Sequence, residues 1–168
     1  MKPNDSAHDL YLRRVRSSDI DLMFYWVNSP DSLRHKKKTQ APVKWSAHQQ
    51  WFNDRLSDSD TRIWIIEKNH KPIGQVRVQL ENGVLSIDIF IDPSQRCKGY
   101  GYKAIKMLIK QCHMIWPGVS VLAEVRNENY PSLSFFIRLG FQISADDEHV
   151  SQLVYKTCLL YTSDAADE

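Results

Sequence analysis

The chain has 168 residues, of which 42% are hydrophobic and 25% are charged, and its formal net charge is +2. This length and composition predict one globular domain that is large enough to bury a hydrophobic core. The small net charge argues against a dedicated nucleic-acid binder, and the sequence shows neither an apolar run that could span a membrane nor a secretory signal.

The first part of the chain predicts one strand followed by helices. Residues 10–14 alternate apolar and charged side chains, as a half-buried strand does. Capping side chains at residues 17–19 precede apolar residues at helical spacing, which predict a helix that ends near residue 28. Residues 31–38 predict a short second helix before a loop at 39–44. Ser46 and Gln49 then form a capping-box pattern that opens a helix to about residue 56.

The rest of the chain predicts a sheet with two more helices. Turn-forming segments separate the first three strands and predict hairpins. The expected fold class is α/β, with a mixed, mostly antiparallel sheet of six to seven strands and about four helices. The strands are expected at residues 62–68, 73–80, 84–91, 119–125, 141–144 and 149–156. The helices are expected at residues 102–116, ended by Pro117 and Gly118, and from the capping residue Asn129 to Gly140.

A glycine-rich segment, Gln95-Arg96-Cys97-Lys98-Gly99-Tyr100-Gly101, stands between the strand at 84–91 and the helix at 102–116. Its two glycines allow a tight turn and leave backbone N–H groups uncovered. Together with the positive end of the following helix, these groups predict an anion site. The alternative is a plain glycine-rich turn, because the segment lacks the lysine and hydroxyl of a P-loop and the third glycine of a dinucleotide fingerprint.

A second motif reads Asn129-x-x-Ser132-x-x-x-Phe136-x-x-x-Gly140-Phe141. The order Arg-x-x-Gly-x-Gly followed by this motif resembles the GNAT (Gcn5-related) N-acetyltransferase superfamily, and the resemblance covers residues 10–157. It implies the GNAT fold and acetyl-CoA as the co-substrate. It also implies that the coenzyme is bound by Ile89, Phe90, Ile91, Arg96, Cys97, Lys98, Gly99, Tyr100, Gly101, Asn129, Ser132 and Phe136.

The resemblance also implies direct attack of a substrate amine on acetyl-CoA. A tyrosine usually protonates the departing thiolate in the family, but Phe136 occupies that position and has no proton to donate. Glu124 matches the general base of the ribosomal-protein alanine acetyltransferases, and its alternative is an exposed glutamate paired with Arg126. Asp88, on the strand before the glycine-rich segment, is a competing base.

The acceptor is expected to lie against the early helices and the middle strands. Segments that contain Trp26, Asn28, His48 and Arg77 resemble acetyltransferases of nonulosonic acid synthesis, which act on a 4-amino sugar carried on UDP, although Val27 replaces an arginine of that family. For the tryptophans and His48, packing in the core is the alternative. A ribosomal-protein-type N-terminal acetyltransferase and a catalytically weak acyl-CoA-binding module are the other functions that the sequence leaves open.

The remaining expectations concern surroundings and chain ends. Cys97, Cys112 and Cys158 have neither metal-ligand nor disulfide spacing, so no metal site is predicted and a reduced, cytoplasmic setting is expected. The basic run at residues 34–38 is either solvated or a contact for an acidic ligand. Residues 158–168 resemble a translated sequencing adapter, so we expect a single domain over 1–157 and a non-native tail. The expected partners are acetyl-CoA and a small-molecule amine, without nucleic acid or membrane, in a monomer or homodimer.

Overall fold

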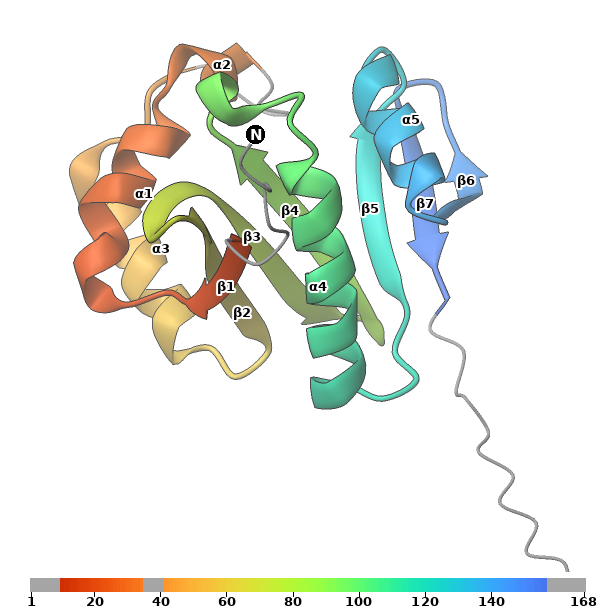
Figure 1. Ribbon diagram of the computed structural model, residues 1–168, viewed down its shortest axis with the longest axis horizontal. Coiled ribbons are helices and arrows are strands. Elements are labelled where there is room, and N and C mark those ends of the chain that lie inside the picture. The colour runs from red at the N-terminus through yellow and green to blue at the C-terminus, as the bar shows by residue number, and fades with distance from the viewer. Residues whose placement is uncertain (1–9, 35–40, 157–168) are drawn as a thin grey trace, which may run out of the picture.

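The computed structural model describes residues 10–34 and 41–156. Within these ranges a seven-stranded sheet runs in the order β1-β2-β3-β4-β5-β7-β6, with five α-helices and two short 3-10 helices around it (Figure 1). The mixed, mostly antiparallel sheet confirms the expected fold class. The strands are β1 Leu10–Arg14, β2 Thr61–Lys68, β3 Lys71–Glu81, β4 Val84–Ile91, β5 Val121–Arg126, β6 Gln142–Asp146 and β7 Val150–Tyr155. The helices are η1 Ser17–Asp19, α1 Ile20–Val27, α2 Pro30–Arg34, α3 Trp45–Ser57, η2 Pro93–Gln95, α4 Tyr100–Ile115 and α5 Tyr130–Arg138.

Strands β1 to β4 form an antiparallel meander. The predicted hairpin turns are present, with positive φ angles at Asn69 and His70 in one turn and at Asn82 and Gly83 in the other. Two consecutive residues with positive φ give the turn whose twist matches that of the flanking strands. The local sequence therefore sets the order and direction of these four strands.

Strands β4 and β5 form the parallel step in the sheet, and they pair over two positions, Leu85 with Val121 and Ser86 with Leu122. From there towards the C-terminal end of β4 the two strands separate (Figure 1). Strand β7 then pairs with β5 along its whole length and lies between β5 and β6. The sheet is thus opened between β4 and β5 at the end where the glycine-rich segment begins.

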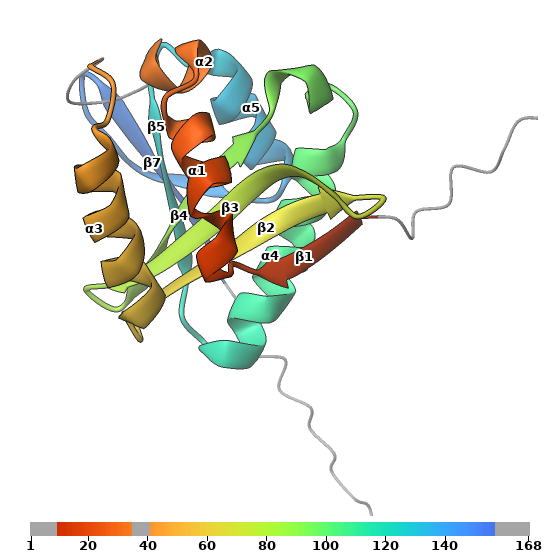
Figure 2. The same cartoon turned by 90° about the vertical axis from the view of Figure 1, so that its left-hand side faces the viewer.

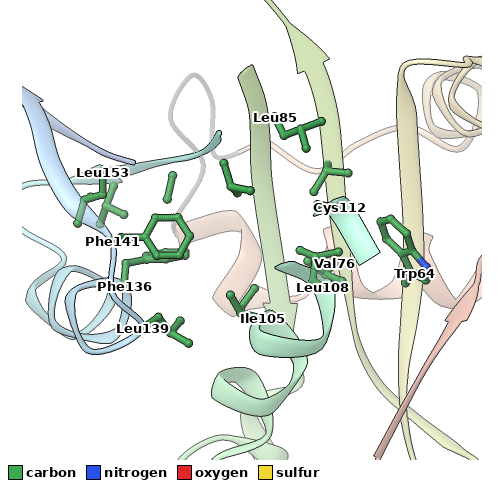
Figure 3. Packing of buried hydrophobic residues seen from close by; sticks show 14 residues of the cluster. Trp64, Val76, Leu85, Ile105, Leu108, Cys112, Phe136, Leu139, Phe141 and Leu153 are labelled. Carbon is green, nitrogen blue, oxygen red and sulfur yellow. The ribbon is translucent and has the colours of Figure 1, made fainter. Parts of the chain in front are cut away.

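Helices cover both faces of the sheet. Helices α4 and α5 pack on one face over the main hydrophobic cluster, which joins Ile105 and Leu108 to Val76, Leu85 and Leu153 (Figure 3). Helices α1 and α3 cover the opposite face (Figure 2), where the second cluster consists of Met23, Trp26, Phe52, Ile63 and Ile65. No helix in the described ranges is both long and apolar enough to cross a membrane.

A cluster of ion pairs links β1 to η1 and to β2. The guanidinium of Arg13 donates to both carboxylate oxygens of Asp19 at 2.8 and 2.9 Å and to Glu67 on β2 at 2.5 Å, while the Arg16 N–H donates to Asp19 at 2.7 Å. Burial alone raises the pKa of Asp19, but the hydrogen bonds from Arg13 and Arg16 outweigh it and hold this pKa below its ordinary value. Asp19 is therefore a buried carboxylate that stabilises the fold as an ion.

Two predicted details differ from the structure. Helix α3 begins at Trp45 with Lys44 as its N-cap and without a side-chain capping bond, so the capping box at Ser46 is not formed. The short second helix begins at Pro30 and is described to Arg34, whereas residues 35–40, which hold the rest of the basic run, lie outside the described residues. The expected tail at residues 158–168 also lies outside them.

Candidate functional site

The opened edge of β4 presents backbone groups that β5 does not pair. The Leu85 N–H donates to the Ser120 carbonyl at 2.9 Å, so the backbone groups of Leu85 point towards β5. Successive residues of a strand point their N–H and C=O to opposite edges. The backbone groups of Ile87, Ile89 and Ile91 therefore point into the opening, beyond the last position that pairs with β5.

The same alternation corrects one sequence prediction. The backbone groups of Phe90 point to β3 and belong to the β3–β4 ladder, in which Phe90 stands opposite Gln75. The strands approach closely here, because a β-carbon on Gly74 would lie 2.2 Å from the Phe90 carbonyl oxygen. Of the expected run 89–91, the backbone of residues 89 and 91 faces the opening and that of Phe90 does not.

The glycine-rich segment turns sharply into α4. Cys97 and Gly99 both have left-handed backbone conformations, with φ of 59° and 79°. Gly99 is the N-cap of α4, and its carbonyl accepts from the Lys103 N–H at 3.1 Å. The N–H groups of the first helical turn, including those of Tyr100 and Gly101, have no partner within the helix and carry its positive dipole. This geometry can hold a phosphate group.

The two basic side chains of this segment are differently engaged. The Arg96 guanidinium donates to Asp31 on α2 through two nitrogens at 2.9 and 2.5 Å, and its Nε donates to the Ile91 carbonyl at 2.9 Å. It also lies 5.8 Å from the ring centre of Phe90. Lys98 donates to the Ser94 carbonyl at 3.0 Å from an exposed position. Arg96 is thus turned towards α2, and most of the anion-binding capacity belongs to the backbone.

The second motif forms α5 and its packing. The Asn129 side chain accepts from the Ser132 N–H at 3.2 Å, so Asn129 caps the helix. Phe136 is buried in the main cluster, with its ring centre 5.1 Å from those of Phe135 and Phe141 (Figure 3). Phe136 is therefore a core residue without a polar atom.

The two candidate bases flank the opening on the face covered by α1 and α3. Continued from the Leu85–Val121 pair, the register of β4 and β5 would set Asp88 opposite Glu124. Asp88 lies 3.6 Å from the Arg77 guanidinium, and exposed Glu124 accepts from the Gln152 side chain at 3.3 Å. The structure thus brings both carboxylates to the same opening, one from each strand.

Glu124 also lines a pocket of about 290 Å³ together with Ala145, Asp146, Asp147, Val150 and Gln152. Three of these residues are carboxylates, and hydrogen bonds from the backbone N–H groups of His149 and Val150 lower the pKa of Asp147. Among the described residues, no group of histidine, cysteine and acidic side chains is arranged to hold a metal ion. The pocket is acidic and suits an organic cation.

Three of the four candidate acceptor residues make contacts within the protein. Trp26 is buried with its ring centre 5.6 Å from that of Phe90. The Asn28 side chain accepts from the Val43 N–H at 2.7 Å and donates to its carbonyl at 3.1 Å. His48 is buried, with Nε2 2.9 Å from the carbonyl oxygen of Ile20. For Trp26 and His48 this placement favours the packing alternative.

Arg77 is differently placed, because it lies at the boundary of the helix layer. Its guanidinium is 5.4 Å from the ring of Trp51 on α3 and faces Asp88 on β4. Gln75 and Gln79 share its face of β3, so this strand carries a polar row, and the β2 residues opposite Gln75 and Arg77 are the apolar Ile65 and Ile63. Gln75 and Asp31 are not among the site residues predicted from the sequence, although the alternation along residues 74–79 already indicates the polar row.

Comparisons with known proteins agree with this geometry. A family model described as an acetyltransferase (GNAT) domain matches residues 9–142. A domain from Methanocaldococcus jannaschii superposes with a TM-score of 0.77 at 22% identity, covering 88% of this chain and 98% of the other. Spermidine N-acetyltransferase from Vibrio cholerae, solved with CoA and spermine, superposes with a TM-score of 0.79 at 17% identity over 88% and 95%. N-acetyltransferase PseH from Campylobacter jejuni superposes with a TM-score of 0.69 at 17% identity over 89% and 99%. No curated protein matches the chain in sequence.

Proposed function

The chain belongs to the GNAT acetyltransferase family, and from this premise we propose that it transfers an acetyl group from acetyl-CoA to a primary amine by direct attack. Enzymes of this family use acetyl-CoA. The observation that carries the proposal is the left-handed Gly99 at the start of α4, beside the opened edge of β4. This arrangement offers a diphosphate site and an unpaired strand edge side by side.

Each part of the coenzyme has a proposed contact. The N–H groups at the start of α4, with Lys98 at the rim, hold the diphosphate. The pantetheine arm lies along the backbone of Ile87 and Ile89 and pairs with it as an added strand would. An N–H of this edge polarises the thioester carbonyl and so favours attack on it.

Glu124 is the proposed general base. A protonated amine must lose a proton before it can attack, and a carboxylate beside the opening can accept that proton directly or through water. Asp88 already faces the Arg77 guanidinium at 3.6 Å, whereas Glu124 is exposed and lines the acidic pocket in which a cationic amine can approach it. These contacts support Glu124 over Asp88.

The acid step does not depend on residue 136. Phe136 is buried among rings and has no proton to give. A coenzyme A thiol is an acidic leaving group that can depart as the thiolate and take its proton from water. Slow turnover follows from the missing acid, because a general acid contributes about 10²–10⁴-fold.

The proposed acceptor is a nucleotide-linked amino sugar, and Arg77 is the observation that supports it. Its contact with Asp88 is long, at 3.6 Å, and the Asp88 side chain is 57% exposed. A phosphate offers a guanidinium a shorter, bidentate contact and can replace this carboxylate. Trp51, beside Arg77, offers a flat ring surface for a base or sugar.

A cationic amine, such as a polyamine, is the second candidate acceptor. The acidic pocket at Glu124, with Asp146 and Asp147, favours it, because these carboxylates attract a positively charged chain and place its amine beside the proposed base. The two acceptors carry opposite charges, so one comparison separates them.

The test is an acceptor panel. Purified protein is incubated with acetyl-CoA and, in separate reactions, a UDP-4-amino sugar, spermidine, an alanine-starting peptide or buffer, and release of free CoA thiol is measured. Release with the sugar alone supports the proposed acceptor, release with spermidine supports the second, and release with the peptide supports an N-terminal acetyltransferase. Thermal stabilisation by acetyl-CoA without release in any reaction identifies a binding module and overturns the proposed catalysis.

A further inference from the structure

The polar row on β3 lies where the helix layer ends. Exposure rises across the strands at the position of Arg77: Ile63 on β2 is 1% exposed, while the side chains of Arg77 on β3 and Asp88 on β4 are 26% and 57% exposed. One row further along, Ile65 on β2 is fully buried and stands beside Gln75. Helices α1 and α3 therefore close this face over β2, while Asp88 on β4 stays exposed and Phe90 on β4 is half-buried.

At this boundary the side chain of Gln75 carries a hydrogen-bond acceptor without a donor in the described part of the chain. Its side-chain carbonyl oxygen is buried, and no described residue donates a hydrogen bond to it. Buried polar atoms in folded proteins nearly always have a partner, because an unpaired one destabilises the fold. Packing does not explain the amide, since its cross-strand neighbours are Ile65 and Phe90, against which an apolar side chain of similar size would fit.

We propose that Gln75 is a specificity-determining residue of the acceptor site, whose side-chain oxygen accepts a hydrogen bond from an N–H or O–H group of the bound acceptor. The donor arrives past Phe90 on β4, which is half-buried beside Trp26 of α1. The acceptor class is then an amine that carries a second polar hydrogen, such as a hydroxyl or an amide, beside the amine that is acetylated. This inference rests on the proposed acetyl transfer.

The test separates recognition from stability. Gln75→Met removes the polar oxygen and keeps the length of the side chain, and Gln79→Met makes the same change on the same face, where no unpaired buried atom stands. With the amine that is active in the panel, KM for the amine and for acetyl-CoA and the melting temperature are measured for both variants. Gln75→Leu replaces the methionine variant if the latter does not fold.

The expected result for Gln75→Met is a roughly tenfold higher KM for the amine, equivalent to about 1.4 kcal/mol, with an unchanged KM for acetyl-CoA. Its melting temperature stays the same or rises, because no protein hydrogen bond is lost and an unpaired polar atom is removed. Gln79→Met changes neither KM.

Two results would overturn the inference alone: an unchanged KM for the amine in Gln75→Met while the wild type is active, or a clearly lower melting temperature, which would reveal a structural partner for the oxygen. Absence of turnover of every amine by the wild type would instead reject the proposed acetyl transfer, and with it the role of Gln75.

Discussion

Replacing Gly74 with alanine tests whether β3 must lie tightly against β4 beside the opened edge. The added β-carbon would lie 2.2 Å from the Phe90 carbonyl oxygen and 3.1 Å from the Ile91 Cα, and real β-carbons do not come within 3.0 Å. The strands must therefore separate by at least 3.0 − 2.2 = 0.8 Å. Because the obstacle is backbone, no change of rotamer relieves it.

The expected loss of stability follows from two opposing effects. Overpacking costs about 1–3 kcal/mol, and the smaller chain entropy of alanine offsets about 0.5–1 kcal/mol of it, so the midpoints of the two ranges leave a net loss of roughly 1 kcal/mol. For a chain of this size, the melting temperature then falls by roughly 2–5 °C. The shift also displaces the backbone of Ile89 and Ile91, so the proposed acetyl-CoA site loses affinity.

Urea and thermal melts measure the stability, and calorimetry measures the acetyl-CoA affinity. Gly101→Ala is the matched control for the stability measurement alone, because its β-carbon would meet ring atoms of Phe135 at 3.5 Å, an ordinary contact, and alanine is favoured inside a helix by about 0.8–1 kcal/mol. This control keeps or gains stability. A Gly74→Ala protein that melts with the wild type and binds acetyl-CoA equally well would refute the reasoning.

Three further predictions concern the base, a buried ion and the thiols. Glu124→Gln lowers kcat by about 10²–10⁴-fold and leaves the Kd for acetyl-CoA unchanged, because an amide cannot accept the proton of the amine. The rate of CoA thiol release measures this, and an unchanged kcat excludes Glu124 as the base. The pKa of Asp19 is lowered in the fold, so its stabilising charge is complete above the unfolded pKa and is lost as the pH falls through the folded pKa. Asp19→Asn is thus less stable by about 1.5–3 kcal/mol at pH 7, and in urea melts the difference shrinks below about pH 4, whereas a pH-independent difference speaks against the ion. In a chain with Cys158→Ser, a thiol reagent modifies the exposed Cys97 in the native state. It reaches Cys112, whose burial raises its pKa to about 12, only on unfolding. Acetyl-CoA is expected to slow the labelling of Cys97, and a labelling rate that saturating acetyl-CoA does not change argues against the proposed site.

Local patterns predicted the elements with a clear period or a strong turn. Strand β4 has the predicted bounds, the hairpin turns have the expected positive φ angles, and Asn129 caps α5. The capping box at Ser46 is not formed because the N-cap lies two residues earlier, at Lys44, and the helix begins at Trp45, whose ring packs edge-on against Phe24 of α1. A contact between helices overrode a local signal there.

The missing parts of the candidate site depend on long-range geometry. The contact between Asp31 and Arg96 joins residues 65 positions apart, and no local pattern indicates it. The separation of β4 from β5 after Ser86 is likewise a property of the assembled sheet. Gln75 could be assigned to a face from its alternation with Val76, but its lack of a donor emerges only when its neighbours are in place.

The ion pair between Arg96 and Asp31 affects how the acetyl-CoA affinity of the proposed coenzyme site depends on ionic strength. The bidentate pair cancels most of the arginine charge, which leaves, within the glycine-rich segment, Lys98 and the neutral N–H groups of the α4 terminus to face an incoming diphosphate. Dissolved ions screen attraction between exposed full charges far more than short contacts to backbone dipoles. We therefore expect the affinity of the proposed site for acetyl-CoA to depend only weakly on ionic strength.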